Sequence, residues 1–80
     1  MRTWHVIPGE RLEVEVDPTG WPYRIQIGAD VAGARPEKRR VRREVKAFAW
    51  RRVPQLGSGR HDVLVHDRAG SRKVGVVVVS

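Results

Sequence analysis

The stretch RLEVEVDPTGWPYRIQIG, residues 11–28, alternates apolar and polar side chains on both sides of a short polar break. A period of two residues is typical of a β-strand with one face in a core. The break, DPTG at 17–20, has the Asp, Pro and Gly preferences of a type I turn. The stretch therefore predicts two consecutive strands that share a core. The inward residues would be Leu12, Val14, Val16, Tyr23, Ile25 and Ile27.

The same pattern continues toward both ends of the chain. HDVLVHD at 61–67 alternates with Val63 and Val65 on one face, and DRAG at 67–70 is a second type I turn candidate. TWHVI at 3–7 predicts another short strand. The valine-rich end, SRKVGVVVVS, predicts a last strand whose inward residues would be Val74, Val76 and Val78. GADVAGARP at 28–36 and QLGSGR at 55–60 would be mobile loops.

Strands that recur roughly every 10 residues with turns between them are typical of a sandwich or a small barrel. Eighty residues are enough for one domain, here 1–80. A chain of this size buries only about 60% of its unfolded surface, so it needs a good core or a partner. Without cysteine there is no disulfide or thiolate site, and three histidines do not favour structural zinc, so we expect no metal and no cofactor.

Targeting signals are not expected either. The residues after Met1 lack the apolar region of a signal peptide. The longest apolar run, at 76–79, is far short of the ~20 residues that span a bilayer. We therefore expect a protein that is made and used in the cytoplasm, or assembled there into a larger particle, with no membrane partner.

The net charge of +7 is concentrated in one segment. Nine basic and two acidic residues lie between Arg35 and Arg52, whereas seven basic and seven acidic residues cancel elsewhere. A local basic block of this kind predicts a binding face for an acidic partner.

This basic segment, PEKRRVRREVKAFAWRRVP at 36–54, can be interpreted in two ways. As a helix it would gather Val41, Val45, Phe48 and Ala49 in one stripe, but its first turn would carry basic residues, the wrong sign for a helix N-terminus. As strands it would place Val41, Val45, Ala47, Ala49 and Val53 on one face, interrupted by Arg43 and Arg51, with Arg42, Glu44, Lys46, Phe48, Trp50 and Arg52 on the other. The neighbouring strands favour the second interpretation, and the helix remains open.

The stretch VPQLGSGRHDVLVHDRAG at 53–70 resembles the closing hairpin of immunoglobulin-like domains of the IPT/TIG and related bacterial or phage types. PGERLEVEV at 8–16 resembles their first hairpin. His61 stands where these domains often have tyrosine, so a tyrosine corner is not expected. The resemblance implies a single immunoglobulin-like β-sandwich of about seven short antiparallel strands, without shared catalytic residues. The matching residues are Val53, Pro54, Leu56, Gly59, Asp62, Val63, Val65 and Gly70.

Catalytic patterns are weak, and we expect no enzyme. His61 and His66 are five residues apart on one strand and would point to opposite faces. The serines lack a nucleophile elbow, and no glycine-rich loop has phosphate-binding spacing.

We therefore expect a structural protein that docks on an acidic protein surface. The resemblance suggests a phage capsid decoration protein, located in the virion and able to form homo-oligomers. The alternatives are a nucleic-acid or polyanion binder, with Phe48 and Trp50 stacking bases, and, if the segment is a helix, a membrane-surface element. Partner-binding candidates are Arg39, Arg40, Arg42, Arg43, Lys46, Trp50, Arg51 and Arg52.

Overall fold

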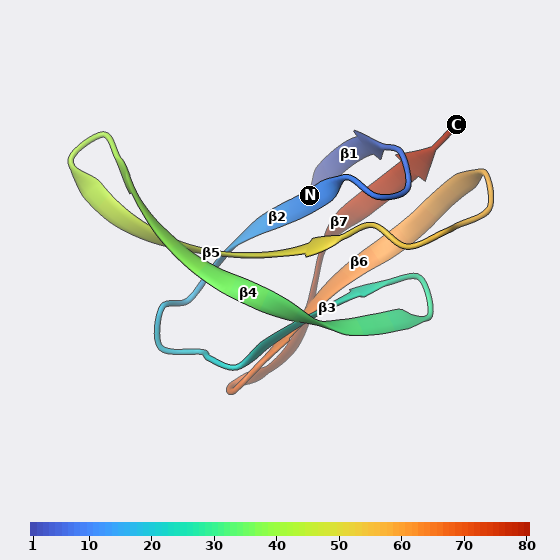
Figure 1. Ribbon diagram of the computed structural model, residues 1–80. Coiled ribbons are helices and arrows are strands. Elements are labelled where there is room, and N and C mark those ends of the chain that lie inside the picture. The colour runs from blue at the N-terminus through green and yellow to red at the C-terminus, as the bar shows by residue number, and fades with distance from the viewer.

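The computed structural model describes residues 1–80 as an all-β chain without helices (Figure 1). No helix is therefore present that could cross a membrane. The strands form one curled, seven-stranded mixed sheet with the order β1-β7-β6-β3-β4-β5-β2. Their bounds are β1 Arg2–Val6, β2 Arg11–Val16, β3 Tyr23–Ile27, β4 Asp30–Val41, β5 Glu44–Arg52, β6 Gly59–Asp67 and β7 Gly70–Val79.

The first strand departs from the antiparallel pattern. β1 pairs with β7 in parallel, from Arg2 opposite Gly75 to Val6 opposite Val79, whereas the other neighbours are antiparallel. The expectation of antiparallel strands throughout is therefore wrong at this edge. Gly75 makes the parallel contact possible, because a Cβ there would lie 2.2 Å from the Arg2 carbonyl oxygen and 2.5 Å from the Trp4 ring.

β4 gives the sheet its curl because it changes partner along its length. Its first half, Asp30–Ala34, pairs with β3, and its second half, Arg35–Val41, pairs with β5. The predicted loop at 28–36 is therefore wrong, since only the turn at 28–29 lies outside the strands. The small residues of this segment resemble loop composition, but tertiary pairing overrides their low β-propensity. The other predicted loop, 55–60, is irregular as far as Ser58.

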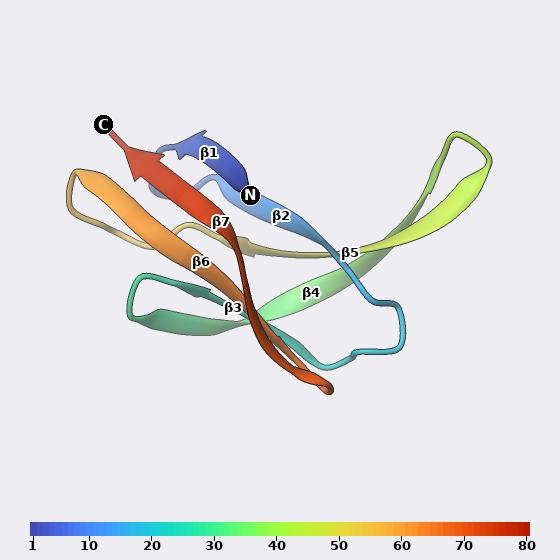
Figure 2. The same cartoon turned by 180° about the vertical axis from the view of Figure 1, so that it is seen from behind.

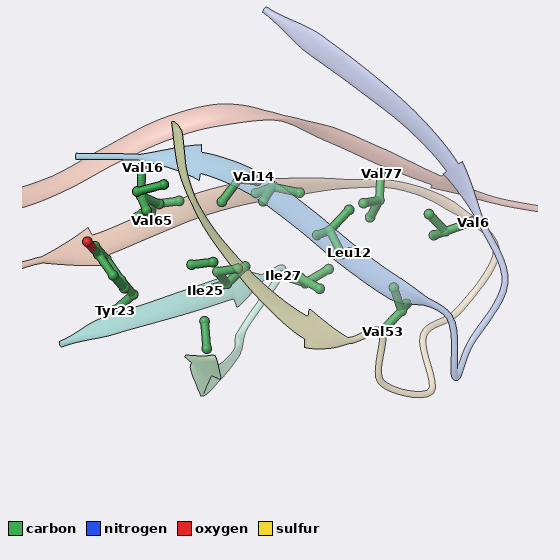
Figure 3. Packing of buried hydrophobic residues seen from close by; sticks show 14 of the residues in the cluster. Val6, Leu12, Val14, Val16, Tyr23, Ile25, Ile27, Val53, Val65 and Val77 are labelled. Carbon is green, nitrogen blue, oxygen red and sulfur yellow. The ribbon is translucent and has the colours of Figure 1, made fainter. Parts of the chain in front are cut away.

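The core lies inside the curl, between the β2–β5 side and the β3–β6–β7 side (Figure 3). The predicted inward faces of β2, β3 and β6 are confirmed. Ile25, Ile27, Val63 and Val65 are fully buried, and Leu12 is 1% exposed. Alternation predicted these residues correctly because each strand has one face toward the core.

β7 follows the prediction only in its first half. Val74 packs against the core, but farther along Val77 and Val79 enter the core cluster, and Val76 and Val78 do not. The pairing with β6 shifts register beside Val63, so that one residue of β7 is left without an opposite partner. Such a bulge moves the following side chains to the other face. Val76 is buried as predicted, with 7% of its surface exposed, but it lies outside the core cluster, and the prediction of Val78 as an inward residue is wrong.

The basic segment forms the end of β4 and all of β5, joined by a tight turn at Arg42–Arg43. The strand interpretation is confirmed, and the helix interpretation is wrong. Ala47 and Ala49 face the core as predicted. Val41 pairs with Glu44 and so shares the face of Lys46, opposite to the face that we predicted for it.

Candidate functional site

The β4–β5 hairpin extends beyond the rest of the molecule in both views (Figures 1 and 2). β2 accompanies β5 only as far as the pair Val16–Ala47, so residues 39–46 form a two-stranded ribbon that no third strand supports. Val45 within it is 63% exposed. We call residues 39–46 the distal hairpin.

The turn of the distal hairpin is strained. Arg42 and Arg43 have φ angles of 49° and 74°, the left-handed region that glycine tolerates best. Two-residue hairpin turns of this kind prefer Asn-Gly because a Cβ clashes there. A non-glycine residue in this region costs about 1 kcal/mol or more. The turn therefore carries two arginines at positions that backbone stability alone would not choose.

Cations without carboxylate partners gather at this end of the hairpin. No carboxylate oxygen lies within 4.0 Å of any of four cations, which are Lys38, Arg40, Arg42 and Arg43. All four side chains are exposed. Alternation places Lys38 and Arg40 on the ribbon face that carries Ala47 and Val45, their cross-strand neighbours. We call this set the tip cluster: Lys38, Arg40, Arg42 and Arg43.

Nearer the body of the molecule, the outward face of β2, β4 and β5 holds two aromatic rings under guanidinium groups. The Arg11 guanidinium lies 3.8 Å from the centroid of the Trp50 ring, and that of Arg39 lies 4.1 Å from the centroid of Phe48. Arg35 and Arg52 lie 5.8 and 5.6 Å from Trp50. These cation–π contacts leave both rings half-buried, so neither is an open platform for a base.

Carboxylates on the same outward face pair with its cations. Arg39 donates through Nη1 to Glu13 at 2.6 Å and to Glu37 at 3.1 Å. Arg11 lies 3.6 Å from Glu37. The hydrogen bond from Arg39 lowers the pKa of Glu13 below its ordinary value, and the same bond raises the pKa of Arg39. A similar ion pair of 3.7 Å joins Lys46 to Glu15.

This pairing divides the predicted partner-binding residues into three groups. Arg39 and Lys46 are paired on the outward face, and Trp50 and Arg52 lie at its base. Arg40, Arg42 and Arg43 belong to the tip cluster, together with Lys38, which the prediction missed although it lies in the same charge run. The eighth predicted residue, Arg51, lies elsewhere.

Arg51 is buried, with 8% of its surface exposed. Its guanidinium donates to the carbonyl oxygens of Ile25 and Asp30, both at 3.0 Å, and to the Asp30 carboxylate at 2.9 Å. It therefore connects β5 to the β3–β4 hairpin, and its donors face the interior of this chain. The sequence signal was its position on the apolar face of the strand, between Ala49 and Val53.

The histidines take part in local hydrogen bonds. His66 Nε2 lies 2.7 Å from Gln26 Oε1, and His61 Nε2 lies 2.8 Å from the Gly57 carbonyl oxygen. No group of three or more His, Asp or Glu side chains is arranged to hold a metal ion.

Comparisons with known proteins give no relative. No family model matches the chain, and neither a curated protein nor a solved structure shows significant similarity to it. The function must therefore be argued from the geometry.

Proposed function

We propose that the chain is a non-enzymatic interaction protein that docks on an acidic protein surface through the tip cluster. The observation that carries the proposal is the set of four cations at the end of a protruding hairpin, none of them paired within the chain. Free guanidinium groups can bind carboxylates through two parallel hydrogen bonds. The strained arginine turn supports a role for these side chains beyond folding.

The scaffold of this module would be an immunoglobulin-like β-sandwich. Two groups of hydrogen-bonded strands support this interpretation, β3-β6-β7 and β4-β5-β2. Immunoglobulin domains use the corresponding strands C, F and G in one sheet and D, E and B in the other. In this chain β4 would pass from the first sheet to the second, and β1 would extend the first.

The setting that we propose is a phage capsid, on which the chain would act as a decoration protein. The support is the sequence resemblance to small immunoglobulin-like domains, which is an argument by analogy from fold to use. A decoration protein of this kind would saturate particles at a ratio fixed by the symmetry of the coat. It would form part of the virion after assembly in the cytoplasm.

A protein partner suits the distal hairpin better than a nucleic acid does. Val45 is 63% exposed and lies directly opposite Arg40 in the tip cluster. Its methyl groups gain free energy only against an apolar surface, which a row of phosphates does not offer. The covered rings of Phe48 and Trp50 also weigh against base stacking. A two-stranded β-ribbon is also an element that can enter the major groove of DNA, so polyanion binding is the second candidate.

The proposal can be tested with two acidic probes, a polyglutamate peptide of about 30 residues and a DNA duplex of about 30 base pairs, titrated from about 50 to 300 mM salt. Arg40→Glu with Arg42→Glu should weaken polyglutamate binding at least about tenfold. Arg24→Glu with Arg60→Glu makes the same charge change on β3 and β6, at exposed residues without ion pairs, and should retain most of the affinity.

Equal losses in both double variants would mean that net charge alone drives binding, which contradicts docking through the tip cluster. Tight DNA binding at about 150 mM salt, with a slope that indicates several phosphates, would favour the polyanion function instead.

A further inference from the structure

The sheet divides at the base of the hairpin and leaves part of β4 with one free edge. Residues Asp30–Ala34 pair only with β3. The pairing between β4 and β5 starts at Arg35 opposite Trp50, although β5 continues to Arg52. The edge of Asp30–Ala34 that faces away from β3 therefore has no strand beside it. Alternate N–H and C=O groups of an antiparallel strand point to this side.

The central residues of this edge, 31–33, include no residue that protects it. Proteins usually block a free edge with lysine, proline, a bulge or a covering loop. Here the residues are Val31, Ala32 and Gly33, which are small or apolar, and a Cβ on Gly33 would meet no atom within 4 Å. Val31 is 45% exposed. By contrast, the free edge strand β2 carries Glu and Arg at alternate positions.

A cleft of about 520 Å³ lies beside this edge. Arg51 lines it from within, but its charge is already paired with Asp30. Arg35 and Arg52 also line it, and neither has a carboxylate oxygen within 4.0 Å. Both guanidiniums lie within 6 Å of the Trp50 ring, which completes an amphipathic wall. The lining residues are Ala32, Gly33, Arg35, Trp50, Arg51 and Arg52.

We infer that this cleft binds an extended acidic segment of a partner protein, which adds as a strand along residues 31–33 of β4. The backbone of the segment would bond to the free edge, as in other cases of β-strand addition. Its carboxylates would bind Arg35 and Arg52, which share a face with Trp50, and its alternate apolar side chains would lie on the other face, beside Ala32. Charge complementarity selects an acidic occupant over a second copy of this basic chain.

This site does not depend on the proposed role of the tip cluster. Glu44, which follows the turn, and Trp50 are six residues apart along β5, which corresponds to roughly 20 Å in a strand. The two sites can therefore be tested separately by charge reversal at one end of the hairpin or the other.

The experiment uses a short peptide of alternating Glu and Val residues, titrated into the isotope-labelled protein and followed by NMR. We expect the amides of residues 31–33 to shift and to exchange more slowly with solvent when the peptide binds. Arg35→Glu should weaken the binding that the amides of residues 31–33 report at least about tenfold, whereas Arg60→Glu, at an exposed arginine of β6 outside both sites, should change it less than about twofold.

Three results would overturn the inference. The first is no binding by the unmodified protein at peptide concentrations up to about 1 mM. The second is binding without any change at residues 31–33. The third is an equal loss of binding in Arg35→Glu and Arg60→Glu, which would mean that net charge alone drives binding.

Discussion

The strands β3 and β6 and the distal end of β5 each continue an alternating apolar face, but they lie in opposite environments. In β3 and β6, the alternate apolar residues Ile25, Ile27, Val63 and Val65 are fully buried. In the distal hairpin, Val45 lies on the face that continues from the buried Ala47, yet it is 63% exposed. The difference is that β3 and β6 face β2 and β5 across the core, whereas nothing lies opposite the distal hairpin. Alternation thus predicts strands, but a facing layer decides burial.

The turns of the two regions differ in the same way. At the β6–β7 turn, the Asp67 carboxylate accepts hydrogen bonds from the backbone N–H groups of Ala69 and Gly70. Gly70 takes the positive φ of 138°. At the β4–β5 turn two arginines take positive φ angles instead. The first turn has side chains that stabilise it, and the second exposes two cations at a conformational cost.

The largest expected effect is on stability, and it tests the difference in burial between β3 and the distal hairpin. Ile25→Ala should lower the free energy of unfolding by about 3 to 4 kcal/mol, because it removes fully buried methyl groups and leaves a cavity. Val45→Ala should change it by less than about 0.5 kcal/mol. Urea denaturation of both variants measures the difference. A similar loss in both would show that Val45 is packed in solution, and the contrast would fail.

The second-largest expected effect is the difference in stability when each of two adjacent arginines of β5 is replaced. Arg51→Met should destabilise the fold by about 2 kcal/mol, because it removes the guanidinium that donates hydrogen bonds to Ile25 and Asp30 of the β3–β4 hairpin. Arg52→Met, at an exposed neighbour, should cost less than about 0.5 kcal/mol. Thermal unfolding at neutral pH checks this pair. Equal effects would mean that Arg51 has no structural role beyond that of a surface arginine.

The smallest expected effect is on the pH dependence of stability, to which an ion pair of the outward face contributes. The pKa of Glu13 is lowered in the folded state by the hydrogen bond from Arg39. Its contribution to stability is therefore present above its ordinary pKa of 4.5 and is lost as the pH falls through the lower folded-state pKa. Glu13→Gln should flatten the acid side of the stability–pH curve, measured by urea denaturation between about pH 7 and 2. An unchanged slope would show that the Arg39 bond does not persist in solution.

The sequence predicted the all-β class, the strand character of the basic segment and the inward faces of β2, β3 and β6, because these depend on local alternation. It did not predict the inward face of β7 past Val74, because that face depends on a bulge opposite Val63. It also did not predict the part of β4 at 30–36. The small residues and Pro36 of this segment favour a loop, but pairing with β3 and then with β5 outweighs that preference.

The sequence predicted the candidate site only as a run of basic residues. The cross-strand register decides which of these residues are paired with carboxylates. The strand register places Glu13 and Glu15 of β2 close to two cations of the hairpin. Glu13 forms an ion pair with Arg39 of β4, and Glu15 forms one with Lys46 of β5. These carboxylates lie more than 20 residues away in sequence from the cations that they bind. Sequence spacing alone therefore could not separate paired arginines from those of the tip cluster.

The central claim is that Arg42 and Arg43 are present at the turn for binding and not for folding. The most direct measurement is the stability and the polyglutamate affinity of one double variant, Arg42→Asn with Arg43→Gly, beside Arg24→Gln with Arg60→Gln as the charge-matched control. We predict that the turn variant is more stable by about 1 kcal/mol, because Asn-Gly suits this turn. We also predict that its Kd rises at least about tenfold relative to the control. A turn variant that gains stability and binds as tightly as the control would contradict the claim.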